Sequence, residues 1–568
     1  MFRAYWTLAL DPQSAYAVQA ERYVFYWPLY STHLLAPRYC CLRFHRGYIF
    51  VAALLLQFVA GSIYAISSVA GPINAYFRFP ENSPNARNAI VLTGILSVLA
   101  QTLLGPLVER KGPRFSLAIS TCVMAVGLLT GQIASLLRIW PLLPIGTCLG
   151  GMAFAAIVLA SISTALKWAP DARGAVAGIC LFGFGLGKHV WGLLFESLLD
   201  GTDATFQYLF WILLAVLLST LSLATLIIRL PPRDFSVRGH DMHCIPCAKA
   251  PSASLVQDEF LHVGMTLVNY KAIARHSSSL VEGTDRRYHE QVKALSLLQC
   301  IFSTDFAFLL LALISNSTVG LFYNEMTAIQ VRSDFLSDVY HISDAAADAV
   351  RLRGVAADLA GRLVMPILSD ICIRLLYGNP AFVRKGCFLV LLLVQCVALP
   401  IVYFSSNQMT DFASVERLLY LLAFASNSGA ALLVCFLADM FGVYHVGTMY
   451  GLSSLLWVVG QGILLAFGVD STAVIGRQVL LFWYLSLAGL VLMLLVRTNS
   501  SDRFYRGYQF TVCGKVFVRR PWSAMRDIHH TMDVYADVPD ANHGRVSMPY
   551  LWSSSSSLGS WDEGYPAK

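Results

Sequence analysis

Two charged residues, Asp358 and Arg362, lie four positions apart in a long apolar segment. At about 100° per residue they share one helix face with Asp348 and Arg351. A carboxylate and a guanidinium at this spacing can pair, and such a face is too costly to expose to lipid, so it should line an internal pathway. The guanidinium fork suits a carboxylate ligand, and the aspartate could then take up a proton. The pattern therefore predicts a binding and proton-coupling site, with a simple lock between helices as the structural alternative.

Lys188 and His189 are the next candidates for binding a polar solute. They lie near the middle of GICLFGFGLGKHVWGLLFE, where an ionised group costs about 3 kcal/mol on insertion scales. We expect them to line a polar cavity or to pair with Glu196 or with an acid on the segment of Asp358. The GFGLG stretch has no strand before it, so it does not indicate a nucleotide site.

Two further residues could contribute from neighbouring segments. Tyr64 lies among the small residues of Gly61–Ile73, and we consider that it faces the cavity, although close helix packing is the simpler interpretation. Asp305 is a further buried acid and a candidate proton or cation partner.

A short loop between two apolar segments carries the residues of a conformational latch. Its glycines permit a tight turn, and its charges can hold two helices together. A degenerate copy, Pro366–Arg374, follows 261 residues later and indicates two repeated halves. The latch residues are Gly105, Glu109, Arg110, Gly112 and Arg114 in the loop, and Asp370 and Arg374 in its copy.

The composition is that of a membrane protein. Of 568 residues 56% are hydrophobic and 13% are charged, against about 25% charged in soluble proteins, and the mean hydropathy is +0.59. A helical span needs about 20 apolar residues. We predict an all-α membrane protein with twelve transmembrane helices in two pseudo-symmetric six-helix bundles. The spans lie near 47–72, 89–108, 114–136, 140–166, 173–198, 207–229, 300–323, 345–369, 387–405, 416–439, 447–469 and 478–497.

The distribution of Lys and Arg places both termini and the central loop in the cytosol. The predicted parts are a tail (1–46), a bundle (47–230), a weakly helical or disordered loop (231–298), a bundle (299–497) and a tail (498–568). We expect no disulfide, no cofactor, no nucleic-acid partner and a monomer in the plasma membrane or an acidic organelle membrane.

The central loop contains HDMHCIPC, in which His240, His243, Cys244 and Cys247 are of metal-ligand type. The second ligand pair of a zinc finger is missing, so chance is the favoured explanation.

Several stretches resemble the nodulin-like branch of the major facilitator superfamily, near the monocarboxylate and oxalate–formate carriers. They are WAPDARGAVAGIC, AGRLVMPILSD and NSGAALLVCFLADMFGVYHVGTMYG, while GPLVERKGPR resembles the signature loop of the whole superfamily. The resemblance implies that Asp358 and Arg362 handle the proton and the carboxylate. The carriers' lysine of the first span is absent near Ser68, and their lysine of the eleventh span is also absent, so Lys188 could stand in. These departures argue against a simple monocarboxylate.

The favoured function is a secondary transporter with alternating access, proton-coupled, for a small polar solute, with an organic anion preferred. One alternative is an iron or other transition-metal transporter using His189, buried acids and the loop cluster. The other is a membrane sensor that does not transport. We find no catalytic motif in a plausible setting, so an enzyme is not expected.

Overall fold

The computed structural model describes most of the chain apart from the two terminal tails and the middle of the central loop. The described residues are 44–80, 83–199, 203–232, 235–245, 286–326, 344–376, 378–407, 412–467, 472–505, 507–512 and 515–521.

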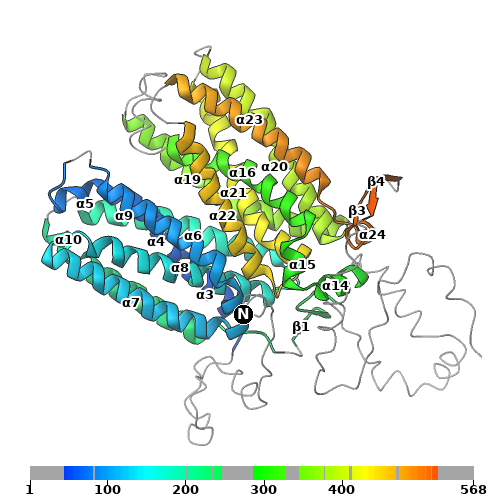
Figure 1. The fold of residues 1–568 in the computed structure, drawn as a ribbon, viewed down its shortest axis with the longest axis horizontal. Coiled ribbons are helices and arrows are strands. Elements are labelled where there is room, and N and C mark those ends of the chain that lie inside the picture. Colours follow the sequence, from blue (N-terminus) through cyan, green and yellow to red (C-terminus); the bar gives the residue numbers. More distant parts are fainter. Residues whose placement is uncertain are drawn as a thin grey trace, which may run out of the picture. The chain divides into compact units, whose positions relative to one another are not determined.

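Long apolar helices make up both halves of the chain (Figure 1). The first half contains α3 (Gly47–Ala60), α4 (Ser62–Ala65), η2 (Ile66–Val69), α5 (Ala70–Tyr76), α6 (Asn85–Lys111), α7 (Pro113–Leu137), α8 (Leu142–Lys167), α9 (Arg173–Leu199) and α10 (Asp203–Ile227). The second half contains α16 (Thr304–Met326), α19 (Asp344–Leu376), α20 (Pro380–Asn407), α21 (Phe412–Phe441), α22 (Val446–Phe467) and α23 (Thr472–Leu495).

The helices agree with the predicted spans. Among the described residues, eight helices are long and apolar enough to cross a membrane, and three shorter apolar stretches lie in α16, α22 and α23. Together with α19, which carries charged residues along its length, they account for the twelve predicted spans. The first span is broken into α3, α4, η2 and α5, a subdivision that the apolar pattern did not predict.

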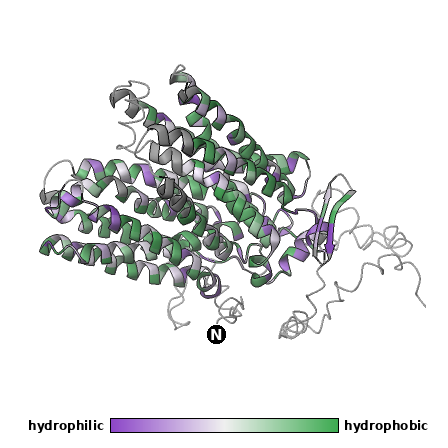
Figure 2. Cartoon of the chain, turned by 45° about the horizontal axis from the view of Figure 1, so that its top comes forward, coloured by the Kyte–Doolittle hydropathy of each residue, from purple (hydrophilic) through white to green (hydrophobic). Residues whose placement is uncertain are grey.

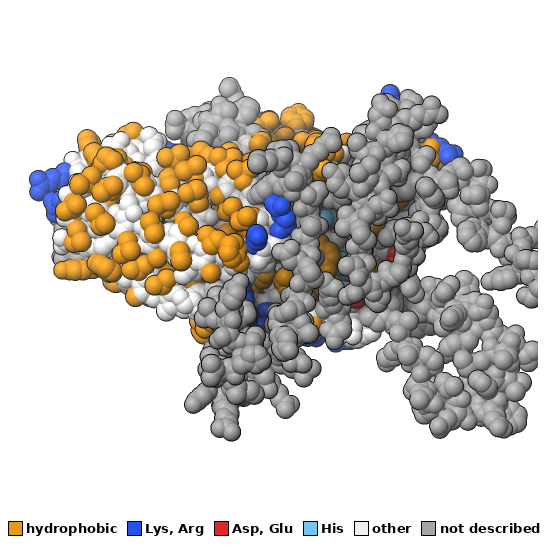
Figure 3. Space-filling view, turned by 60° about the horizontal axis from the view of Figure 1, so that its bottom comes forward, with side chains coloured by type: hydrophobic (Ala, Val, Ile, Leu, Met, Phe, Trp, Pro, Cys, Tyr) orange, Lys and Arg blue, Asp and Glu red, His pale blue; other side chains and the backbone are white. Residues whose placement is uncertain are grey.

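The surfaces of the helices are suited to lipid. Hydrophobic residues run along the helices (Figure 2), and one face of the molecule is broadly hydrophobic (Figure 3). Leu137 on α7 and Tyr208 on α10 are among the large apolar side chains that are more than half exposed. The most deeply buried stretches include Ala153–Ala160 in α8 and Ala431–Met440 in α21. The fold is that of an all-α membrane protein, as the composition predicts.

Several helix pairs join the halves. Helix α6 packs against α22, and α9 packs against α19 and α21. Where the first pair meets, a Cβ atom on Gly105 would lie 2.6 Å from Cα of Thr448, so only glycine allows this approach. Gly112 joins α6 to α7 with φ of 84°, which glycine adopts without strain.

The central loop is more ordered at its ends than the sequence indicated. Strands β1 (Ser236–Val237) and β2 (His240–Asp241) form a small antiparallel hairpin, and α14 (Arg286–Lys293) and α15 (Leu297–Ile301) lead into the second half. The weakly helical prediction holds for α14 but not for the hairpin. It was missed because strands of two residues leave no periodic pattern.

Residues Ser501–Lys568 form a separate unit. Its described part contains most of α24 (Ser500–Arg503) and an antiparallel hairpin of β3 (Gly507–Val512) and β4 (Lys515–Pro521). The sequence pattern did not predict this hairpin. The rest of the tail lies outside the described residues, as does most of the predicted N-terminal tail.

Candidate functional site

The charged pair of α19 lies at the centre of a buried polar network that connects three helices. Arg362 donates from Nε to Oδ1 of Asp358 at 2.7 Å and from Nη2 to Oδ1 of Asn427 on α21 at 2.8 Å. The second oxygen of Asp358 lies 3.0 Å from Nε2 of His189 on α9. Asp358 and Arg362 are buried. The predicted i, i+4 pair is present, and the structure adds Asn427 as a further partner of the guanidinium.

Lys188 and Tyr64 also belong to this cluster. Lys188 interacts electrostatically with Asp358 and Arg362 of α19. Tyr64 is 44% exposed, packs edge-on against Phe184 at 5.4 Å, and interacts electrostatically with Arg362. That Tyr64 faces a cavity stays a prediction. The side chains of Asp348 and Arg351 lie outside the described part of the chain.

Glycines on α9 make room for the guanidinium. A Cβ atom on Gly185 would lie 2.7 Å from Nε of Arg362, and one on Gly178 would lie 3.2 Å from the carbonyl oxygen of Arg362. Gly187 similarly meets the backbone of Phe58 on α3. The GFGLG stretch therefore serves helix packing and the placement of Arg362, in agreement with the rejection of a nucleotide loop.

The exposure of the network differs from one end to the other. The side chain of His189 is 24% exposed, whereas that of Asp358 is only 6% exposed. An imidazole can donate through one nitrogen and accept through the other. The arrangement can therefore carry a proton between a solvent-accessible histidine and a buried carboxylate whose other oxygen is held by a permanently charged arginine.

The first latch lies where α6 meets α22. Glu109 accepts a hydrogen bond from the backbone N–H of Gly447 at 3.0 Å, at the N-terminus of α22, and forms a 2.6 Å ion pair with Lys167 of α8. An acid at a helix N-terminus is stabilised by the free N–H groups and the helix dipole. Glu109 therefore contacts the second half through Gly447 and the first half through Lys167.

The two arginines of the same loop act within the first half. Arg114 donates to the carbonyl oxygens of Ile228 at 2.9 Å and Leu226 at 3.2 Å, at the end of α10. Arg110 donates to the carbonyl oxygen of Pro106. These hydrogen bonds fix the loop to helices of the first half.

The degenerate copy forms a second latch, in which an acid again accepts hydrogen bonds from the N-terminus of a helix in the opposite half. Asp370 of α19 accepts hydrogen bonds from the N–H groups of Gly174 at 3.0 Å and Ala175 at 2.8 Å, at the N-terminus of α9. Arg374 donates to the carbonyl oxygen of Asp171 at 2.7 Å. Both predicted residues of the copy therefore contact the first half, although the copy lacks the glycines of the first loop.

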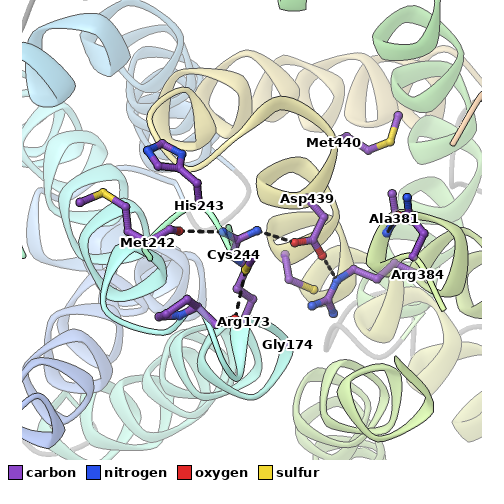
Figure 4. A network of polar contacts seen from close by, with 12 residues as sticks. Arg173, Gly174, Met242, His243, Cys244, Ala381, Arg384, Asp439 and Met440 are labelled. Carbon is purple, nitrogen blue, oxygen red and sulfur yellow. Dashed lines mark hydrogen bonds and ion pairs between the residues drawn. The ribbon is translucent and has the colours of Figure 1, made fainter. Parts of the chain in front are cut away.

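Asp439 extends this second latch (Figure 4). Its Oδ1 atom forms a 2.7 Å ion pair with Arg173 of the first half, and its Oδ2 atom pairs with Arg384 of the second half. Arg384 also pairs with Asp370 at 2.9 Å and donates to Ser369. A buried acid between two arginines therefore ties α9, α19, α20 and α21 together.

The ordered ends of the central loop cover these contacts. Arg173 donates to the carbonyl oxygen of Met242 at 2.8 Å (Figure 4), and the thiol of Cys244 donates to that of Pro170 at 3.2 Å. His445 lies 2.9 Å from the carbonyl oxygen of Leu295. The loop thus contacts the ends of both halves and is more than a tether.

Two of the four residues of metal-ligand type in the loop, His243 and Cys244, contact the helical body. The ring of His243 packs on Tyr444 at 4.8 Å, and burial, reinforced by Lys293 and Arg173, lowers the pKa of His243 to about 3. Burial raises the pKa of Cys244 to about 11, which keeps the thiol protonated. Cys247 lies outside the described residues. Among those described, no group of three or more His, Cys, Asp or Glu side chains is arranged to hold a metal ion.

Asp305 does not join the network around Arg362. It lies in the first turn of α16 and forms a 2.9 Å ion pair with Arg497, whose backbone N–H it also accepts. Arg497 follows the end of α23, so the pair fastens two helix ends of the second half. The apolar pattern placed Asp305 in a span but could not show that a helix end would supply its partner.

The sequence analysis did not single out several residues of these networks. Asn427 was noted only within a resembling stretch, because a lone amide in an apolar helix gives no charge signal. Asp439 and Arg384 lie 55 residues apart, so no spacing rule links them. Two of these residues could have been found from the sequence. Lys167 and Asp439 are charged residues in apolar helices, so each should have a partner.

Comparison with known proteins covers most of the helical body. The Major Facilitator Superfamily model matches residues 50–463. The chain belongs to this superfamily. It is a multi-pass membrane transporter and not an enzyme.

Two relatives and two solved structures illustrate the similarity. An uncharacterized MFS-type transporter of Escherichia coli, YhjX, is 22% identical over 72% of this chain and 84% of its own length. The oxalate:formate antiporter of Oxalobacter formigenes is 26% identical, but over only 28% of this chain and 38% of its own. The proton:xylose symporter XylE has a TM-score of 0.54 at 13% identity, over 79% of this chain and 94% of its own. A bacterial homologue of the iron transporter ferroportin has a TM-score of 0.53 at 13% identity, over 79% and 98%. These structures show the shared fold alone.

Proposed function

We propose that this transporter moves a small organic anion together with a proton, and that it belongs to the nodulin-like branch of the superfamily. The observation that carries the proposal is the shared carboxylate of Asp358, which is held by Arg362 on one oxygen and by His189 on the other. The match to an oxalate:formate antiporter supports the choice of an anion.

Competition for the guanidinium couples the two substrates. In the empty state Asp358 neutralises Arg362, which has no other acidic partner within the described network. An entering carboxylate takes the donor fork of Arg362, which suits bidentate binding. Asp358 then loses its counter-charge and accepts the proton that His189 can deliver. Lys188 and Tyr64 contact the anion from α9 and α4.

The latches supply the conformational change. Glu109 and Asp370 hold the halves together at one end, which we assign to the cytosolic side from the distribution of basic residues in the sequence. The state is then closed toward the cytosol. Opening on that side requires both carboxylates to leave the helix N-termini of the opposite half, so the latches set the populations of the two states.

The test is transport by purified protein in proteoliposomes, with Arg362→Lys and Asp358→Asn compared. Lysine keeps the charge but loses the planar fork that contacts Asp358 and Asn427 together. One hydrogen bond to a charged group contributes about 1.5–3 kcal/mol, so we expect anion uptake to fall by about tenfold or more. Asp358→Asn should abolish uptake driven by a proton gradient while anion exchange continues.

Two matched controls accompany this test. Arg417→Lys changes an arginine whose described hydrogen bonds reach only its own helix, and it should leave uptake unchanged. Both site variants should reach the membrane at normal levels. If Arg362→Lys transports normally, the pair is a helix lock and the anion proposal fails. Metal-ion transport would then be tested with ferrous iron.

A further inference from the structure

The hairpin of β3 and β4 is held to the turn before it by specific contacts. Asp502 accepts hydrogen bonds from the backbone N–H of Thr511 at 2.9 Å, from its hydroxyl at 2.6 Å and from the amide of Gln509 at 3.1 Å. Arg519 donates to the hydroxyl of Tyr505 at 3.0 Å and lies over that ring. The hairpin is therefore a built element rather than an accidental pairing of strands.

The second strand exposes apolar side chains on both of its faces. Val516, Phe517 and Val518 are 51%, 72% and 47% exposed, and Arg519 and Arg520 beside them are also exposed. Successive residues of a strand point to opposite sides, so neither face is covered. A two-stranded hairpin is marginally stable alone, and an edge strand with three adjacent apolar residues invites a partner.

Charge and chain length identify that partner. Residues 497–521 contain six Lys or Arg and one acid, Asp502. Gly507 follows the last residue of α23, Leu495, by only twelve positions, a reach of at most about 40 Å. The hairpin is thus tethered close to the membrane surface where the last span ends. A second copy would bring the same positive charge and be repelled, whereas an anionic leaflet attracts it.

We propose that the exposed face of β4 binds the anionic lipid headgroups of the leaflet at which α23 ends. Phe517 inserts at the level of the headgroups, where aromatic rings are favoured, and Arg519 and Arg520 contact lipid phosphates. Each basic residue near an anionic surface raises the membrane-binding constant about fivefold, so the two arginines together raise it about thirtyfold. The tail beyond residue 521 then starts from a point fixed on the membrane.

The test is amide hydrogen exchange of the full-length protein in nanodiscs of phosphatidylcholine, with or without phosphatidylserine. We expect residues 515–521 to exchange more slowly when phosphatidylserine is present. Arg519→Gln with Arg520→Gln should remove that difference, and Arg519→Lys with Arg520→Lys should keep it because the charge remains. Phe517→Ser should weaken it without changing the charge.

Three results would overturn the proposal. Equal exchange in the two lipid compositions would show that charge attraction is absent. Equal protection in lipid-free detergent would show that the hairpin packs on the protein itself. Protection that appears only in discs holding two copies would assign the face to self-association.

Discussion

Replacing Gly447 by alanine tests whether the carboxylate of Glu109 holds the halves together. A Cβ atom at this position would meet Oε1 of Glu109 more closely than real Cβ atoms allow, and would also lie 3.2 Å from Cβ of Ser163. The carboxylate must therefore move off the N-terminus of α22. The ion pair with Lys167 can follow this movement, because the ammonium group is flexible.

The size of the effect follows from the bond that is lost. A hydrogen bond from a backbone N–H to a carboxylate contributes about 1.5–3 kcal/mol. This bond joins the two halves and must break when they separate at this end, so its loss penalises the closed state alone. At 1.4 kcal/mol per factor of ten, the ratio of closed to open molecules should fall about 10- to 150-fold.

The assay is a distance measurement by pulsed electron resonance in nanodiscs. Spin-labelled amino acids at Lys111 and Leu376, at the ends of α6 and α19, report the separation of the halves and leave the native cysteines in place. We expect Gly447→Ala to add a population of longer distances.

Gly94→Ala is the matched control, since a Cβ atom there meets nothing within 4 Å. It should leave the distance distribution unchanged. If Gly447→Ala also leaves the distribution unchanged in a well-folded protein, the cap does not hold the closed state and the latch argument is wrong.

Three further predictions concern other charged and titratable groups. Glu109→Gln should change the transport rate with little change in anion affinity, and a large loss of affinity in folded protein would instead place Glu109 in the binding site. Asp305→Asn should lower the melting temperature, because it leaves Arg497 buried without its carboxylate at a cost of about 3–5 kcal/mol, and proton coupling per folded molecule should persist. His243 follows β2 and His289 lies in α14, and burial lowers the pKa of His243 to about 3 and of His289 to about 4. If opening of the latches exposes these two histidines, it should bind protons. The closed state should therefore weaken progressively as the pH falls below about 6.5, and distances that do not change between pH 7 and 5 would contradict this.

The fold was predictable from the sequence because its main signals are local. An apolar run of about 20 residues specifies a span by itself, and Asp358 and Arg362 are neighbours on one helix whatever surrounds them. The glycine and charge pattern of Gly105–Arg114 also specifies a helix junction locally. These inferences needed no knowledge of which helices pack together.

The partners of the charged residues could not be predicted, because they depend on which helices pack together. Asn427 and His189 reach Asp358 and Arg362 only because α9, α19 and α21 converge, and periodicity does not contain that information. The partner of Asp305 was hidden for the same reason. Asp305 lies in an apolar segment, yet its position in the first turn of α16 places it beside Arg497.

A comparison of the two latches explains why the degenerate copy, Pro366–Arg374, keeps the acid of the first loop but lacks its glycines. Glu109 and Asp370 are 261 residues apart, the same offset as between the two copies of the motif. Glu109 caps Gly447 and Asp370 caps Gly174, and these two glycines are 273 residues apart. In the first pair Gly105 provides close approach. In the second pair, Pro366 stands where Gly105 stands in the first. The close approach of α19 and α9 there depends on Gly174 of α9.

The same offsets show where the symmetry of the molecule ends. Gly451 packs on the carbonyl oxygen of Gln101 as Gly178 packs on that of Arg362, so Gln101 is the counterpart of Arg362 in the first half. Gln101 is neutral and accepts a hydrogen bond from Ser454 at 2.7 Å. The paired glycines therefore position two equivalent side chains at the interface, and only one of them is charged. The repeat supplies a symmetric scaffold for rocking, while the asymmetry at this one position places a charged guanidinium on α19 and a neutral amide on α6.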